Sequence, residues 1–388
     1  MADQRKRQKY MHARLTPNPL SNRSFPSIHR KRLVYLDQSF LSEMCFRREC
    51  TTPNPIPERL FLQLHKLKAM NKIILVVSDI HCRETSDFPG QYADRMERLW
   101  QFQNGLADGR IAANWEDVLV AQHRKMLSDN DSLSYPVADI RLRDSPQTHN
   151  GVRIVMTNSW LLRIHRDNVA TSEEIDGRYR EVNDRQAMNI PRCAGVADCH
   201  NYIRGLWGTH IHVGTAAWRQ RRDFELSFEQ LGESPDAESL ASLKLPDLHA
   251  TPFLGVIRNV IHGLDGEVAL QRWSDLLEKD LIGPCPSLRI RVALEAELLW
   301  TWHERKRRNP KKFRANFGWS RQNDIDHVSA FVPYVDALTT DRDMHNLCSR
   351  QIVDDEIKRF PCRIFSGKNY DEFEKWLDEL TAETNISN

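Results

Sequence analysis

Carboxylates stand at the ends of predicted strands in two distant parts of the chain. The apolar run RLVYLD (32–37) stops at Asp37, and VDALTTD (335–341) stops at Asp341. The carboxyl ends of parallel strands meet at the edge of an open sheet, where ligands bind. The two aspartates are therefore expected to converge, although either one alone is more often the cap of the following helix.

Further acidic residues lie beside these segments. Glu84 lies six residues beyond the strand KIILVVS (72–78), and Asp324 and Asp326 open a helix just before the last carboxylate-ending strand. Taken singly, Glu84 is ordinarily a surface charge and NDID is a good helix cap. Clustered carboxylates repel one another unless a cation is present, and Mg²⁺ and Mn²⁺ select oxygen ligands. The set therefore predicts an acidic site for two such ions, a chemistry suited to phosphodiester cleavage.

The order of these residues resembles that of the PIN-domain nucleases. The resemblance rests on VYLDQS, a glutamate after the second strand, ND at a helix start, and VDALTTDRDM. It covers roughly 32–105 and 320–382, and it implies a metal-dependent endoribonuclease. The catalytic carboxylates that it implies are Asp37, Glu84, Asp324, Asp326 and Asp341.

Within this set, the resemblance assigns Mg²⁺ or Mn²⁺ to Asp37, Glu84, Asp324 and Asp341. Residues two apart on a helix point about 200° from each other, so only one of Asp324 and Asp326 can face the site, and the preceding Asn323 favours Asp324. Ser39 and Thr340 fall where hydroxyls often hold metal, water or phosphate. The resemblance also places Asp336 near the site.

Two features depart from the family pattern. Gln38 stands in LDQS where the family usually has a small or hydroxylated residue, and the segment 106–319 is far larger than a minimal PIN domain carries. The first is compatible with metal binding, and the second leaves the choice of substrate open.

Alternation of strands and helices predicts an α/β fold. We expect a three-layer α/β/α PIN-like domain with a central, mainly parallel sheet, interrupted by a large all-α insertion. The expected strands are 32–37, 72–78, 335–340 and 362–366. The expected helices include 38–48, 55–70, 114–127, 195–230, 252–264, 267–278 and 288–307. A closing helix is expected over 369–380, with an apolar stripe of Phe373, Trp376, Leu377 and Leu380. The expected parts are a basic, disordered arm at 1–31, the first half of the domain at 32–105, the helical insertion at 106–319 and the second half at 320–388.

A basic run precedes the acidic helix. Residues 305–321 hold eight lysines and arginines and no acid, so they are suited to phosphates, with aromatic rings to stack on unpaired bases. The substrate-binding residues predicted there are Arg307, Arg308, Lys311, Lys312, Phe313 and Trp319. Single-stranded or loop RNA is the expected partner, and DNA is the alternative. The competing interpretation of the run is a solvated loop.

The whole-chain numbers describe a globular protein. Of 388 residues, 40% are hydrophobic and 28% charged, and the net charge is +2, so an anionic partner must meet a local basic patch. No apolar stretch of spanning length or secretion signal is found, so we expect a cytoplasmic protein without membrane contact. A transit peptide in the basic arm is the alternative.

The cysteines are expected to be reduced, because their eight positions are irregular and no secretion signal precedes them. CAGVADCH (193–200) has a gap wider than zinc sites usually show, and zinc there is the alternative to buried thiols. His210 and His212 are expected on a helix rather than at a metal. His327 and His345 are expected near the acidic site.

The alternative to an enzyme is a non-catalytic PIN-fold module that binds RNA or protein, with a regulatory protein as a possible partner. Carboxylates within metal-bridging reach of one another favour the enzyme. A lysine or arginine that plugs the cluster favours the module.

Overall fold

A computed structural model of the chain describes residues 31–46, 55–78, 81, 93–108, 110–112, 115–127, 143–144, 193–230, 252–261, 266–309, 319–366 and 370–383. The chain divides into two units, Met1–Lys31 and Arg32–Asn388. The predicted basic arm lies outside the described residues apart from Lys31. Among the helices described, none combines the length and apolar character needed to cross a membrane.

A six-stranded sheet organises the second unit. Its strands are β1 Arg32–Tyr35, β2 Ile73–Ser78, β3 Arg110–Ala112, β4 Arg143–Asp144, β5 Ala337–Thr340 and β6 Arg363–Ser366. Their spatial order is β4-β3-β2-β1-β5-β6, and all neighbours are parallel except β3 and β4. β2 is a continuous apolar run that is buried along its whole length, as expected of a parallel strand covered on both faces.

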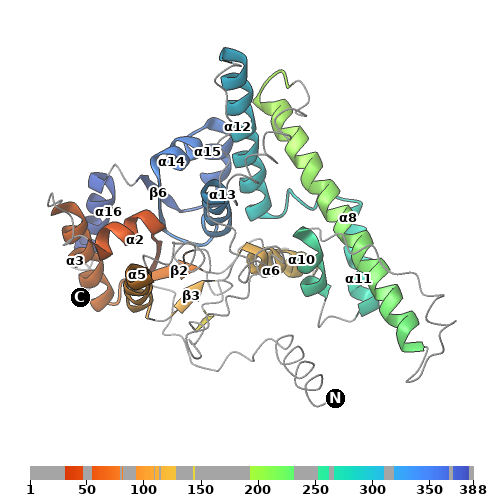
Figure 1. The fold of residues 1–388 in the computed structure, drawn as a ribbon, viewed down its shortest axis with the longest axis horizontal. Coiled ribbons are helices and arrows are strands. Elements are labelled where there is room, and N and C mark those ends of the chain that lie inside the picture. Colours follow the sequence, from red (N-terminus) through yellow and green to blue (C-terminus); the bar gives the residue numbers. More distant parts are fainter. Residues whose placement is uncertain are drawn as a thin grey trace. The chain divides into compact units, whose positions relative to one another are not determined.

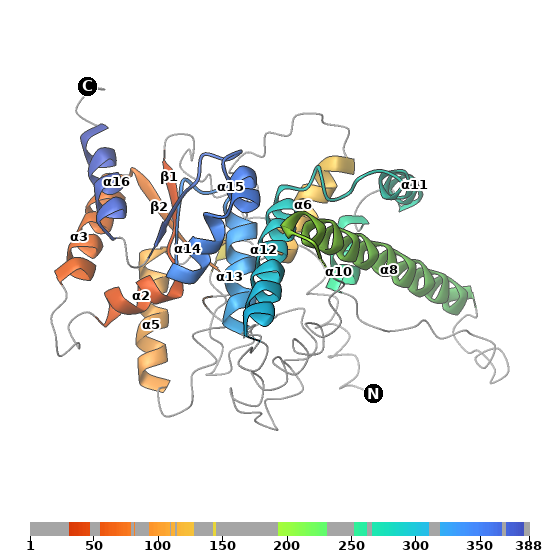
Figure 2. The ribbon, with the colours of Figure 1, turned by 90° about the horizontal axis from the view of Figure 1, so that it is seen from above.

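Helices cover both faces of this sheet, as Figures 1 and 2 show. One face carries α2 Gln38–Cys45, α3 Pro55–Ala69, α5 Ala93–Leu106 and α16 Tyr370–Ala382. Val34, Leu75 and Phe365 come from three different strands and share one hydrophobic core with these helices. The apolar stripe predicted for α16, which consists of Phe373, Trp376, Leu377 and Leu380, is buried in that core.

The opposite face carries α13 Trp319–Phe331, α14 Arg342–Cys348 and α15 Gln351–Ile357. Side chains alternate across a strand, so Tyr35 points away from the core that holds Val34. Its ring stacks on Phe331 of α13 with the centroids 4.5 Å apart. This contact fixes α13, the helix with the predicted acidic residues, against β1.

A second hydrophobic core joins the remaining long helices. These are α6 Trp115–Leu127, α8 Val196–Gln230, α10 Pro252–Ile261, α11 Gly266–Leu277 and α12 Pro286–Arg308. Trp273 of α11 and Leu288 of α12 are fully buried there. α12 also packs against α13, α14 and α15, so it connects this core to the helices on the sheet.

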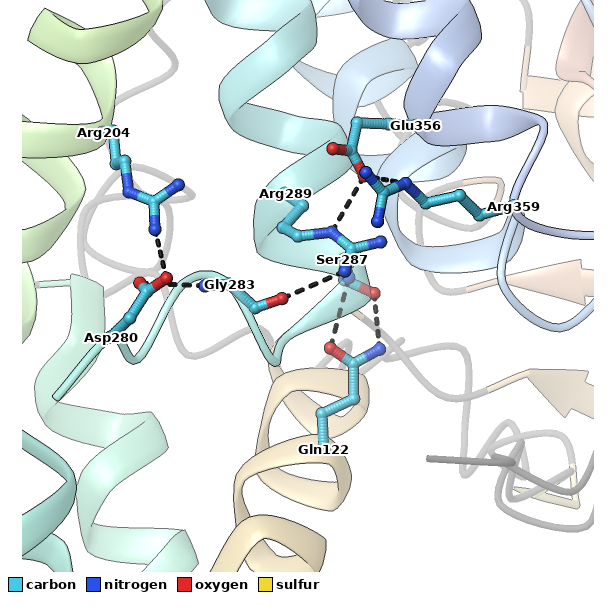
Figure 3. A network of polar contacts seen from close by, with 8 residues as sticks. All are labelled: Gln122, Arg204, Asp280, Gly283, Ser287, Arg289, Glu356 and Arg359. Carbon is cyan, nitrogen blue, oxygen red and sulfur yellow. Dashed lines mark hydrogen bonds and ion pairs between the residues drawn. The ribbon is translucent and has the colours of Figure 1, made fainter. Parts of the chain in front are cut away.

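Polar contacts at the start of α12 tie these elements together (Figure 3). Gln122 of α6 donates to the Ser287 hydroxyl at 2.8 Å, and Arg289 pairs with Glu356 of α15 at 2.8 Å. Arg289 also donates to the Gly283 carbonyl at 3.0 Å. The contacts satisfy polar groups that burial would otherwise leave without hydrogen bonds.

The expected sheet is confirmed, because the four predicted strands lie together and β1 is adjacent to β5. The predicted helices over 38–48, 55–70, 114–127, 195–230, 252–264, 267–278 and 288–307 are also found, with ends shifted by a few residues. The all-α character expected for 106–319 is corrected, because β3 and β4 lie in that range and extend the sheet. Strands this short show no readable alternation, and they form by pairing with an existing strand.

Candidate active site

Asp37 lies where β1 gives way to α2. It is 8% exposed and caps α2, because its carboxylate accepts hydrogen bonds from the backbone N–H and the hydroxyl of Ser39. Its own N–H donates to Thr339 Oγ1 of β5 at 2.9 Å. Burial raises the pKa of Asp37, the hydrogen bonds from Ser39 and Gln38 lower it, and the charge of Asp341 raises it further.

Asp341 occupies the equivalent position after β5. It caps α14 by accepting from the Met344 N–H at 2.6 Å, and its side chain is 45% exposed. β1 and β5 pair in parallel, with Tyr35 opposite Leu338. The two carboxylates therefore stand at the same end of adjacent strands, and the pKa of Asp37 responds to the charge of Asp341.

Asp324 of α13 acts on the same buried group as Asp341. The thiol of Cys348, at the end of α14, has its pKa raised first by burial and then by the charges of Asp324 and Asp341. Asp324 is half-buried. Asp37, Asp324 and Asp341 are all among the described residues, and they do not form a three-ligand group for a metal ion.

Asp326 has different surroundings. Its carboxylate forms an ion pair with Arg291 of α12 and accepts from Gln322 at 3.1 Å. Arg291 is 6% exposed, pairs with Glu295 at 2.8 Å, and lies over the ring of Trp115 at 4.6 Å. Asp326 is therefore engaged in a buried charge network between α12 and α13.

The expectation that Asp336 lies near the site is wrong. Asp336 precedes β5, and its carboxylate accepts from the Arg32 side chain at 2.9 Å and from the Leu33 N–H at 2.8 Å. Both partners are at the beginning of β1, the end opposite to Asp37. A strand advances about 3.3 Å per residue, so the length of β5 separates Asp336 from Asp341.

His81 supports Asp37 from behind, and the sequence alone did not indicate this role. Its ring is fully buried; Nδ1 accepts from the Ser78 N–H at 2.9 Å, and Nε2 lies 2.8 Å from the Leu36 carbonyl. Because Nδ1 is an acceptor, Nε2 carries the proton and donates to Leu36. Burial lowers the pKa of His81 to about 3, so the neutral ring holds the peptide just before Asp37.

Aromatic rings complete this support. Tyr35 stacks on His81 with centroids 4.9 Å apart and meets His327 edge-on at 5.0 Å. His327, which was expected near the acidic site, is only 3% exposed, so its ring is buried in this aromatic cluster. His345 is half-buried on α14.

Gln38 has a structural partner that explains its presence in LDQS. Its amide oxygen accepts from Gln103 of α5 at 2.6 Å, and Gln103 is fully buried. The side chain of Gln38 thus joins α2 to α5. Thr340 is 3% exposed, and it is its neighbour Thr339, which the sequence did not single out, that bonds to the backbone of Asp37.

An arginine also lies at the acidic edge. Arg321, in the first turn of α13, has Nη1 3.9 Å from Asp341 Oδ1 and Nη2 3.3 Å from Asp343 Oδ2. Its side chain is 19% exposed. The basic run predicted to bind substrate therefore reaches the carboxylates through its last residue.

The remaining predicted residues are only partly described. Arg307 and Arg308 are exposed at the end of α12, where Glu304 pairs with both, at 3.9 Å and 3.2 Å. Trp319 begins α13, but its side chain is not among those described. Glu84, Lys311, Lys312 and Phe313 lie outside the described residues.

The donor set suits a hard cation, since it consists of carboxylate oxygens with nearby hydroxyls. The charge of Asp341 raises the pKa of Asp37, and a cation between them would relieve that repulsion. In the described part of the chain, no three His, Cys, Asp or Glu side chains already surround one point. A complete site would therefore need a ligand from outside these residues, and Glu84 is the one that the sequence predicts.

The described cysteines support the expectation of reduced thiols, because none of them forms a disulfide. They are Cys45, Cys193, Cys199, Cys285, Cys348 and Cys362. His210 and His212 lie on α8, as expected.

Comparison with known proteins identifies no relative. No protein-family model matches the chain, and no curated protein and no solved structure matches it significantly.

Proposed function

We propose that this chain is a metal-dependent endoribonuclease whose acidic site lies at the carboxyl edge of β1 and β5. The observation that carries the proposal is the meeting of Asp37 and Asp341 at the ends of adjacent parallel strands, close enough for one charge to act on the pKa of the other. Ligand sites in open α/β sheets form at this edge. The proposed fold is a PIN-like domain with a large, mainly helical insertion.

Asp37, Asp341, Asp324 and Glu84 are proposed to hold Mg²⁺ or Mn²⁺. When bound, such ions supply a more acidic water and charge neutralisation at the leaving oxygen. Ser39 and Thr339 orient Asp37, since one donates to its carboxylate and the other accepts from its N–H. His81 fixes the preceding peptide, so the carboxylate and the backbone that carries it are held in place before any ligand arrives.

RNA is the proposed substrate because a cationic side chain stands at the acidic edge, where Arg321 of α13 lies 3.9 Å from Asp341. Two more arginines of the basic run, Arg307 and Arg308, are exposed at the end of α12. Guanidinium groups bind phosphate through paired hydrogen bonds. A phosphate of RNA bound by Arg321 would lie next to Asp341.

The direct test is cleavage of a mixed pool of short RNAs in the presence and absence of Mn²⁺. The purified full chain should cleave only with the metal, and Asp37→Asn should abolish cleavage. Asp336→Asn is the matched control, because it removes a carboxylate at the other end of β5 and should leave cleavage intact. Metal-independent cleavage, or equal activity in the two variants, would contradict the proposal.

The second candidate is a non-catalytic RNA- or protein-binding module, which the position of Arg321 favours. An arginine 3.9 Å from Asp341 can neutralise the carboxylates without a metal. Calorimetric titration with Mn²⁺ separates the two functions when wild type is compared with Arg321→Gln. The module predicts no binding in wild type, whereas the nuclease predicts binding that becomes tighter in the variant.

A further inference from the structure

A pocket of about 250 Å³ opens on the second half of α12, and Arg350, the residue before α15, forms part of its wall. The other walls come from Glu297, Trp300, Glu304, Arg305 and Arg308. None of these side chains belongs to the acidic edge of the sheet. The volume lies just below the range typical of small-molecule sites, so it suits one compact ligand or one nucleotide.

Glu297 is the unusual residue of this pocket. The residue is 6% exposed, but its carboxylate oxygens are not among the buried polar atoms that lack a partner in the described part of the chain, and the side chain lines the pocket. Burial raises the pKa of Glu297, and the charge of Arg350 lowers it in part. Carboxylates whose pKa is shifted by burial and by a neighbouring charge gather at functional sites. Since Glu297 lines the pocket, a ligand with N–H donors can bond to its carboxylate.

The outer wall of the pocket carries positive charge, in contrast to the carboxylate of Glu297. Arg305, Arg308 and Arg350 are exposed, and only Arg308 has a close acidic partner there, Glu304 at 3.2 Å. Guanidinium groups suit phosphate because their planar donors match its oxygens. Trp300, half-buried and stacked on His303 at 5.5 Å with an angle of 8°, offers a flat ring for a base.

We infer that this pocket binds a guanine nucleotide, with the base edge on Glu297, its plane near Trp300 and its phosphate on the arginines. Guanine alone among the common bases presents adjacent N–H donors, at N1 and N2, to a carboxylate that accepts with both oxygens. Adenine and cytosine place an acceptor beside their amino group, which an ionised carboxylate repels. The ligand is either a free nucleotide or a guanine nucleotide within single-stranded RNA.

This inference does not rest on nuclease activity, because binding is measured without divalent metal and without cleavage. Titration calorimetry of the full chain should show tighter binding of GMP than of IMP, which lacks the 2-amino group, by about 5- to 150-fold, since a bidentate base contact is worth roughly 1–3 kcal/mol. AMP should bind more weakly than GMP. Guanosine should also bind more weakly, because it lacks the phosphate.

Glu297→Gln should remove the preference for GMP over IMP, whereas Glu379→Gln, on the exposed side of α16, should keep it. A second arm replaces GMP by a short single-stranded RNA with one guanosine or one inosine. If only this RNA arm shows a preference for guanosine over inosine, and Glu297→Gln removes it, the natural ligand is a guanine nucleotide within RNA. If neither probe discriminates guanine from inosine, or if Glu297→Gln retains the discrimination while it still folds, the inference is overturned.

Discussion

Replacing Asp326 separates its proposed structural role from the catalytic role proposed for Asp324. Asp326 pairs with Arg291, and the two side chains are only 15% and 7% exposed. A hydrogen bond to a charged group contributes about 1.5–3 kcal/mol, whereas removal of the sole partner of a buried charge costs about 3–5 kcal/mol. Glu295 stays 2.8 Å from Arg291, so we expect Asp326→Asn to lower the free energy of unfolding by about 1.5–3 kcal/mol.

The assay is urea unfolding followed by circular dichroism, with Mn²⁺-dependent RNA cleavage measured on the same samples. Asp326→Asn should unfold at a lower urea concentration and retain cleavage below its unfolding transition. Asp324→Asn should change the midpoint less and abolish cleavage. A double-mutant cycle with Arg291→Met should give a coupling energy for Asp326 within the range of about 0.5–3 kcal/mol seen for contacting residues, and none for Asp324.

The reasoning is refuted by the reverse pattern. If Asp326→Asn unfolds at the wild-type midpoint and loses cleavage, then Asp326 faces the site and its pair with Arg291 contributes nothing to stability. Equal and mild effects of both variants on cleavage would count against either aspartate as a metal ligand.

Three further predictions concern His81 behind Asp37, Glu297 in the pocket and the basic run. His81→Phe should destabilise the chain by about 1–3 kcal/mol for each group that it leaves unsatisfied, Ser78 N–H and Leu36 C=O. The folded-state pKa of His81 is lowered to about 3, so its contribution to the stability of the wild type is present above pH 6.5. As the pH drops toward 3, the free energy of unfolding should fall by up to about 1.4 kcal/mol per pH unit. The same dependence of unfolding free energy on pH in His81→Phe would contradict this. Glu297 has a raised pKa, so its charge costs stability above the folded-state pKa, and Glu297→Gln should unfold at higher urea concentration at pH 7, with the advantage vanishing below about pH 4.5. Neutralising the four cations of the basic run should weaken RNA binding. The slope of log binding constant against log salt concentration should flatten by about 0.7 for each phosphate that the variant no longer binds. An unchanged slope would identify the run as a solvated loop. These four are Arg307, Arg308, Lys311 and Lys312.

The sequence by itself determined the central sheet and most of the long helices. β2 and α16 have strong periodic signals, since one is a continuous β-branched and aliphatic run and the other has an apolar stripe at helical spacing. The adjacency of Asp37 and Asp341 also followed, because parallel strands place their carboxyl ends at one edge. These features depend on local pattern and on the few topologies that short connections permit.

Only the tertiary structure decided what surrounds each carboxylate. The sequence favoured Asp324 over Asp326 only through the neighbouring Asn323, whereas the structure shows that Asp326 pairs with Arg291 of α12, a helix that begins 40 residues earlier in the chain. Asp336 and Asp341 flank the same strand, but only Asp341 lies at the end shared with Asp37. His81 and Glu297 carry no local signal, because the roles assigned to them come from burial, and burial is set by which distant segments pack around a side chain.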